Sequence, residues 1–305
     1  MKLKRKLLTG LILLSSLQAD TFTQISFEQD SDGNINPNIF IPLNWNDNYY
    51  SGIGYTASTT KDIDKLDNFT NSKNGMVSSK KDMTLNWITK KIGNYSIGMM
   101  TTILKIQNNE FGYINDTDNL FGKGSDYLIA FDNDIELNII QTGLYMNYQR
   151  SLNKIDFRVS TTLYPSRNID VTQSTMFKPL VAKNGTSSST TSQNLSYNIG
   201  FETMYNSDSF INIGFEYSYK YEPIKYDIAQ LGTNGTNYIF KTNTIDTDET
   251  TTKYILKASF DKKMLGGLYP TIGFGKVSTE TIDNKTNKST TIDEDIISFG
   301  FEKRF

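Results

Sequence analysis

Apolar and polar residues alternate along most of this chain. The longest regular stretch covers residues 211–222. One parity carries Ile211, Ile213, Phe215, Tyr217, Tyr219 and Tyr221, and the other carries Asn212, Gly214, Glu216, Ser218, Lys220 and Glu222. Successive side chains of a β-strand point to opposite faces, whereas a helix would break this period. The pattern therefore predicts a strand with one apolar and one polar face.

The same period of two predicts about twelve strands over the whole chain. They cover roughly residues 21–29, 38–46, 49–59, 81–91, 94–106, 135–150, 154–165, 192–206, 209–223, 251–262, 267–279 and 293–305. Short polar turns are expected at 46–49, 91–94, 151–154, 206–209 and 262–267, and longer polar connections near 60–80, 107–134, 166–191 and 224–250. Short turns join antiparallel neighbours, so the chain reads as a series of hairpins.

The chain ends on a strand of the same kind. Ile297, Phe299, Phe301 and Phe305 share one parity, and Ser298, Gly300, Glu302 and Arg304 share the other. Lys303 is the exception on the apolar parity, where its long side chain can reach the membrane interface. This ending resembles the C-terminal strand of bacterial outer-membrane β-barrels, which finishes in an aromatic residue. The resemblance implies that Ile297, Phe299, Phe301 and Phe305 form the signal that the barrel-assembly machinery recognises.

The N-terminus has the pattern of a secretory signal peptide. Residues 1–6 are basic, residues 7–14 are apolar, and residues 15–19 include small side chains that predict cleavage after Ala19. The alternative is an uncleaved membrane anchor, but the apolar run is shorter than the roughly 20 residues that a spanning helix needs. We expect a signal peptide over 1–19 and one barrel domain over 20–305.

Composition excludes several classes of protein. The mean hydropathy is −0.44, as expected where apolar and polar residues alternate and cancel. The chain has no Cys and no His, which argues against disulfide scaffolds, thiolate metal sites and Ser-His-Asp hydrolysis. The net charge is −2 before the basic leader is removed, so nucleic-acid binding has no electrostatic support. We expect no enzyme, no metal and no cofactor.

These patterns predict an all-β transmembrane barrel, antiparallel and up-and-down, with short periplasmic turns and long extracellular loops. In lipid every backbone N–H and C=O must be paired within the protein, and a closed sheet achieves this without a free edge. A soluble β-sandwich would also alternate, but it does not account for the Phe-terminated strand. The apolar parity then faces lipid, and the polar parity faces the lumen.

The lumen-facing parity combines small residues with charges of both signs. The charged lumen candidates are Lys90, Asp156, Arg158, Glu202, Glu216, Lys220, Lys253, Lys257, Glu302 and Arg304. They either line a polar pore or pair across strands and close it. Glycines on the same parity, among them Gly52, Gly214 and Gly273, either leave open space or relieve crowding beneath larger neighbours.

Two hypotheses for function follow. The first is a porin-like, narrow passive channel for small hydrophilic solutes or ions in the outer membrane of a Gram-negative bacterium. The second is a non-conducting structural or adhesion barrel whose long extracellular loops carry the function. An enzyme at the barrel rim is a weak third possibility without His. The resemblance implies outer-membrane lipid, lipopolysaccharide and the barrel-assembly machinery as partners.

Overall fold

The computed structural model describes residues 24–31, 33–65, 73–115, 128–178, 182–207, 210–233, 238–260 and 269–302. Within these ranges there is no helix long and apolar enough to cross a membrane. The strands are β1 (Gln24–Gln29), β2 (Ile35–Asn46), β3 (Tyr49–Lys65), β4 (Lys73–Ile92), β5 (Tyr95–Asn115), β6 (Leu128–Leu152), β7 (Ile155–Lys178), β8 (Ala182–Ser192), β9 (Ser196–Tyr205), β10 (Ile211–Thr233), β11 (Tyr238–Phe260), β12 (Tyr269–Asp283) and β13 (Lys288–Glu302).

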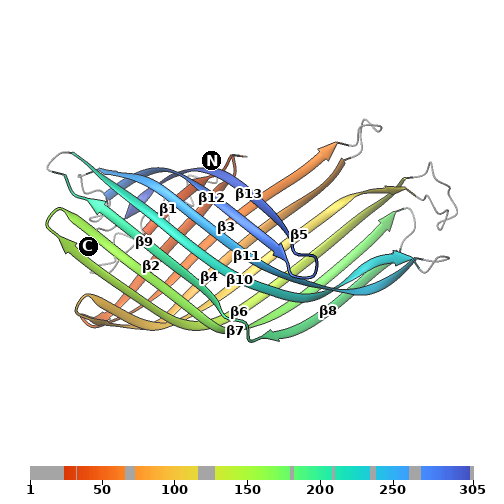
Figure 1. Ribbon diagram of the computed structural model, residues 1–305, viewed down its shortest axis with the longest axis horizontal. Coiled ribbons are helices and arrows are strands. Elements are labelled where there is room, and N and C mark those ends of the chain that lie inside the picture. Colours follow the sequence, from red (N-terminus) through yellow and green to blue (C-terminus); the bar gives the residue numbers. More distant parts are fainter. Residues whose placement is uncertain are drawn as a thin grey trace.

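The sheet closes on itself as an antiparallel barrel (Figure 1). Twelve strands form the ring in the order β1 to β7, then β9 to β13, and β8 branches from β7. The ring closes where β1 meets β13, with Gln24 opposite Glu302 and Gln29 opposite Ile297. The predicted fold, a closed barrel of about twelve strands with its first and last strands joined, is confirmed.

The two ends of the barrel differ. At one end, which we call the base, β1 begins and β13 ends, and the turns 47–48, 93–94 and 153–154 connect neighbouring strands. Gly93 and Asn153 have φ values of 60° and 53°, a backbone conformation that two-residue hairpin turns require. We call the opposite end the far end. The predicted turns at 46–49, 91–94 and 151–154 are confirmed, and the one at 262–267 lies outside the described residues.

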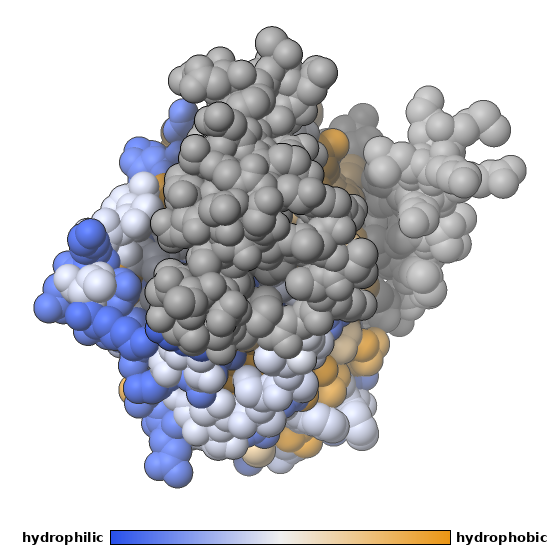
Figure 2. Space-filling view, turned by 90° about the vertical axis from the view of Figure 1, so that its right-hand side faces the viewer, coloured by the Kyte–Doolittle hydropathy of each residue, from blue (hydrophilic) through white to orange (hydrophobic). Residues whose placement is uncertain are grey.

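An apolar belt surrounds the outer surface near the base. Ile53, Met83, Leu163 and Phe274 are among its exposed side chains. Phe27 of β1 stacks on Phe299 of β13, with their ring centroids 5.7 Å apart. Such a surface suits contact with lipid hydrocarbon and would be unfavourable in water. Seen from the far end, hydrophilic residues gather at the rim and apolar residues appear on one flank (Figure 2).

Several strands continue far beyond this belt. β6 has 25 residues and β7 has 24, whereas a tilted spanning strand needs about 9–11. On β5 the outward parity changes from apolar Met99 and Ile103 to Lys105 and Gln107, which marks the boundary of the belt. The expectation of long loops is therefore wrong for most of the polar stretches. The described parts of 60–80, 107–134, 166–191 and 224–250 are strands that project from the belt.

The strand that pairs with β7 changes from β9 to β8 along the barrel wall. The base half of β7 pairs with β9 as far as Tyr164–Ser196, whereas its far half pairs with β8, beginning at Arg167–Ser192. The ladder between β9 and β10 ends at Tyr197–Tyr221. Among the described residues, the far part of β10 pairs with β11 alone. The ring is therefore continuous through β9, and the described residues of β8 and β10 are not paired with each other toward the far end.

Candidate functional site

Charged residues of alternating sign form a connected series of ion pairs inside the barrel near the base, which we call the basal ion chain. In order, it consists of Glu28, Lys253, Glu216, Lys257, Glu202 and Arg158. The Nζ atom of Lys253 lies 3.7 Å from a carboxylate oxygen of Glu216, and that of Lys257 lies 3.1 Å from Glu202. These residues come from β1, β11, β10, β9 and β7, and the polar parity of these strands points inward at this level of the barrel.

Burial makes each member of the chain depend on its neighbours. Lys257 is 6% exposed and Glu202 is 7% exposed. A buried charge without a partner is costly, and a buried charge between two opposite charges is tolerated. Glu202 is shared by Arg158 and Lys257, and Glu216 is shared by Lys253 and Lys257. Each of these carboxylates therefore holds two cations in place.

A second group, which we call the cross-lumen cluster, spans the barrel from wall to wall. Lys80 and Asp82 belong to β4, Lys220 and Glu222 to β10, and Glu249 to β11. Going around the ring, β5, β6, β7 and β9 lie between β4 and β10 on one side, and more strands lie on the other. Ion pairs between these strands must therefore cross the lumen.

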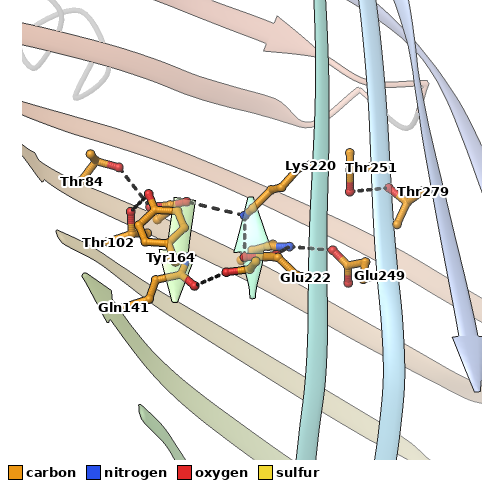
Figure 3. A network of polar contacts seen from close by, with 12 residues as sticks. Thr84, Thr102, Gln141, Tyr164, Lys220, Glu222, Glu249, Thr251 and Thr279 are labelled. Atoms are coloured by element: carbon orange, nitrogen blue, oxygen red, sulfur yellow. Dashed lines mark hydrogen bonds and ion pairs between the residues drawn. The ribbon is translucent and has the colours of Figure 1, made fainter. Parts of the chain in front are cut away.

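The distances in this cluster support direct contact across the lumen. The Nζ atom of Lys80 lies 2.9 Å from Glu249 and 3.5 Å from Glu222. The Nζ atom of Lys220 lies 2.9 Å from Glu222 and 4.0 Å from Asp82. Figure 3 shows Lys220, Glu222 and Glu249 meeting in this region. The lumen is thus constricted here by side chains of both signs.

Neutral hydrogen-bonding groups surround the constriction. The hydroxyl of Tyr164 on β7 lies 2.7 Å from Oγ1 of Thr102 on β5 and reaches past β6 to do so. Ser196 donates to Oε1 of Gln141 at 3.1 Å. Figure 3 places Tyr164, Thr102 and Gln141 beside the charged residues. These groups and the ion pairs make a polar layer through the middle of the barrel.

Beyond the constriction, part of the inner face is apolar, on β5, β6, β7 and β10. The buried residues Leu104, Leu137, Ile139, Ile169, Val171 and Ile224 form what we call the far-end apolar cluster. Along β10 the inward positions run from Glu216 through Lys220 and Glu222 to Ile224. The interior is therefore charged near the base, and an apolar cluster follows beyond the constriction on these strands.

The side chain of Gln173 on β7 forms hydrogen bonds with the edge of β10 that faces β8. Gln173 of β7 donates from Nε2 to the carbonyl of Ala229 at 2.8 Å and accepts from the Ala229 N–H at 2.7 Å. It thereby replaces two ladder hydrogen bonds at a position where β8 does not pair with β10. Unpaired buried backbone groups are costly, so this glutamine stabilises the far end of the wall.

Glycines on the inner face accommodate neighbouring side chains. A Cβ atom on Gly52 would come within 2.7 Å of the Phe40 ring, and one on Gly214 would come within 2.7 Å of Met204. A Cβ on Gly273 would come within 2.6 Å of Ile255. Of the two interpretations of the glycine-rich face, the structure favours relief of crowding at these positions over open space.

The structure places most of the predicted lumen residues on the inner face. Those described there are Asp156, Arg158, Glu202, Glu216, Lys220, Lys253 and Lys257. Asp156 accepts a hydrogen bond of 2.6 Å from Asn206. Glu302 ends β13, and Arg304 and Phe305 lie outside the described residues. Ile297 and Phe299 are exposed on the outer face, and Phe301 packs against Ile25 there.

The expectation that Lys90 faces the lumen is wrong. It is exposed, and its Nζ atom lies 5.9 Å from the ring centroid of Tyr49. A register shift between Asn86 and Ile88 on β4 reverses the parity of the residues that follow, so the buried Thr89 faces inward and Lys90 does not. A bulge of this kind cannot be read from simple alternation.

The sequence interpretation missed Glu28, Lys80, Asp82, Glu222 and Glu249. Glu222 stands on the polar parity of the clearest strand in the chain, so its position was a usable signal. Glu249 and Lys80 lie in stretches that were expected to be loops, where no inward direction was assigned. Within the described ranges, no group of three or more His, Cys, Asp and Glu side chains is placed to hold a metal ion.

Comparisons with known proteins give distant structural similarity. No protein-family model matches the chain, and no curated protein matches it significantly. The toluene transporter TbuX of Ralstonia pickettii has a TM-score of 0.42 at 10% identity, covering 93% of this chain and 88% of that chain. The translocator domain of the autotransporter NalP from Neisseria meningitidis has a TM-score of 0.47 at 11% identity, covering 100% of this chain and 97% of that chain. The fold shown by the structure itself is a closed antiparallel β-barrel of twelve strands, and no subfamily is assigned.

Proposed function

We propose that the protein is a narrow passive channel of the outer membrane for small hydrophilic solutes or ions. The observation that carries this proposal is the cross-lumen cluster, where Lys80 meets Glu222 and Glu249 from the opposite wall. Lysine and glutamate side chains are long and flexible, so a constriction made of them can part without movement of the sheet. Polar side chains then supply the path along which a hydrated solute passes.

The chemistry of the lining supports passage more than stability. Buried ion pairs are often no more stabilising than apolar residues of the same size, so a purely structural interior has little reason to carry so many. The two signs are close to balanced in the basal ion chain and in the cross-lumen cluster. A lining of this kind favours general permeability to small polar solutes over strong selection between cations and anions.

We place the base at the periplasmic side and the far end outside the cell. The base carries the short turns and both chain ends of the described barrel, in the arrangement typical of bacterial outer-membrane barrels. The proposal includes export by a signal peptide cleaved after Ala19 and insertion by the barrel-assembly machinery. It includes no catalytic role.

The test is conductance of the purified full-length mature protein in planar lipid bilayers. The wild type should show small discrete steps. The variant Lys80→Ser/Glu222→Ser removes both partners of the ion pair that crosses the lumen at 3.5 Å, together with their contacts to Glu249 and Lys220. It leaves the net charge unchanged, so its steps should be larger. The matched control is Lys225→Ser/Asp246→Ser, which removes an exposed ion pair of 2.7 Å between β10 and β11 and should conduct like the wild type.

The second candidate is a barrel that does not conduct. The far-end apolar cluster favours it, because its buried side chains on β5, β6, β7 and β10 offer a hydrated solute no polar contacts. Heat-dependent mobility in gels shows whether the wild type and Lys80→Ser/Glu222→Ser are folded. If both are folded and neither conducts, the channel proposal is wrong and this second function remains.

A further inference from the structure

Within the part of the chain that the structure describes, Arg167 is a buried arginine without a hydrogen-bond partner. It is 1% exposed, and its Nε, Nη1 and Nη2 atoms have no acceptor among the described residues. The register of β7 shifts just before it: Leu144 lies opposite Leu163, but Thr142 lies opposite Ser166. This bulge turns Arg167 to the inner face, in line with Ile169 and Val171.

The buried guanidinium of Arg167 lacks a hydrogen-bond acceptor among the described residues. An unpaired buried charge is among the most costly features of a protein interior. Glu222 is close enough to act on Arg167 electrostatically, but its carboxylate lies 2.9 Å from Lys220 and 3.5 Å from Lys80. The acceptor that Arg167 requires is therefore not supplied by that carboxylate.

The surroundings define what the missing acceptor can be. On one side lies Gln141, which stands opposite Arg167 on β6 and is buried. On the other side Ile139 and Ile169 stand opposite each other and begin the far-end apolar cluster. Arg167 also lies beside the break in the wall, where the β7–β8 ladder ends at Ser192 and the β7–β9 ladder begins at Ser196. The site is thus largely dry, with a break in strand pairing next to it.

We propose that Arg167 binds a small, singly charged carboxylate inside the barrel. The planar guanidinium offers parallel N–H donors that match the two oxygens of a carboxylate. A single negative charge fits the site better than a doubly charged oxyanion, because Glu222 already places negative charge nearby. The apolar side chains of Ile139 and Ile169 suit the hydrocarbon part of an organic acid. The site does not depend on conduction and stands separately from the proposed channel.

The test uses the detergent-solubilised full-length mature protein and sodium acetate as the probe. The midpoint of thermal unfolding is measured against acetate concentration at constant ionic strength, with chloride as the balancing anion. The wild type should show a saturable rise, since a ligand that binds only the folded state stabilises it. In Arg167→Met the rise should be absent, and the midpoint without acetate should be higher than in the wild type, because an unpaired buried charge has been removed.

Two further variants keep the test decisive. Arg150→Met removes an exposed arginine near the base and should respond to acetate like the wild type. Arg167→Lys keeps the charge and loses the bidentate geometry, so its response should need at least about tenfold more acetate. The proposal is overturned if the wild type shows no saturable response, if Arg167→Met responds equally, or if inorganic phosphate stabilises the wild type and acetate does not.

Discussion

The interior of this barrel is held together in two different ways. Near the base, the basal ion chain links charges of alternating sign, and Glu202 alone serves both Arg158 and Lys257. Toward the far end, Leu104 and Ile169 pack within an apolar cluster that needs no particular partner. An ion pair needs a particular geometry, and a charged group can exchange one partner for another. Apolar packing has no such directional requirement. The difference teaches that rearrangement is easiest in the charged part, while the apolar part maintains the shape of the barrel.

The largest effect is expected from removing a shared carboxylate. Glu202→Leu leaves Arg158 and Lys257 without the group they share and should lower the free energy of unfolding by about 3–5 kcal/mol. The measurement is guanidinium unfolding in detergent micelles. The control is Glu136→Leu, whose exposed pair with Lys105 at 2.7 Å should contribute at most about 1 kcal/mol. Equal losses in the two variants would remove the distinction between interior and surface charge.

The next largest effect is expected from a substitution in the far-end apolar cluster. Leu104 is fully buried in the far-end apolar cluster, so Leu104→Ala should cost about 2–5 kcal/mol by leaving a cavity. Ile103, its neighbour on β5, is 36% exposed on the outer face, and Ile103→Ala should cost clearly less in the same unfolding experiment. If Ile103→Ala costs as much as Leu104→Ala, the cluster is not the packed core of the far end.

A smaller, local effect tests how the far end of the wall is closed. Gln173→Ala removes both hydrogen bonds to the backbone of Ala229 and should cost about 1–3 kcal/mol. Amide hydrogen exchange at Ala229 should become faster, while exchange on the base half of β10 stays slow. Thr172→Ala changes an exposed neighbour on β7 and should leave the Ala229 amide protected. Unchanged exchange in Gln173→Ala would show that another contact holds this edge.

The smallest effect concerns a charge outside the barrel interior. Asp283 accepts hydrogen bonds of 2.8 Å from the Lys285 N–H and 3.2 Å from the Thr286 N–H in the turn after β12. The backbone N–H of Lys285 is the main reason that the pKa of Asp283 lies below its ordinary value of 3.8. Since the folded pKa is lowered, the stabilisation is present above about pH 4 and is lost as pH falls through the folded value.

This titration separates an exposed charge from the buried ones. The carboxyl carbon of Asp283, followed by NMR, should titrate with a midpoint below 3.8. The difference in unfolding free energy between the wild type and Asp283→Ala should shrink on going from pH 6 to pH 2. A midpoint at the ordinary value would show that the turn does not bind the carboxylate in solution.

The alternation of residues predicted the barrel because the sheet has two different environments along its belt. Where lipid lies outside and polar groups lie inside, as along Ile211–Tyr221, parity alone identifies the face. Beyond the belt this contrast is reversed on β7, where Ile169 and Val171 are buried and Asp170 and Thr172 are exposed, so an apolar parity no longer marks the outer face. The polar stretches 166–191 and 224–250 were therefore predicted as loops, although their described residues continue the strands.

The candidate sites were less predictable because bulges reverse parity. The shift on β4 turns Lys90 away from the lumen, and the shift on β7 turns Arg167 toward it. Pro165 lies at the second shift, and proline within a strand is a recognised sign of a bulge or an edge. Partners such as Lys80 and Glu222 come from distant strands, so their meeting depends on the closed ring and not on local sequence.

The contact between Glu28 and Lys253 has a consequence for assembly. The two residues are 225 positions apart and lie on β1 and β11, so they meet only after the first strand has joined the last. Contacts this remote in sequence form late, since the entropy of closing so long a segment must be overcome first. A bond that forms after the transition state slows unfolding more than it speeds folding. We therefore expect this ion pair to slow the separation of β1 from β13, so that the closed ring lasts longer than it would without the contact.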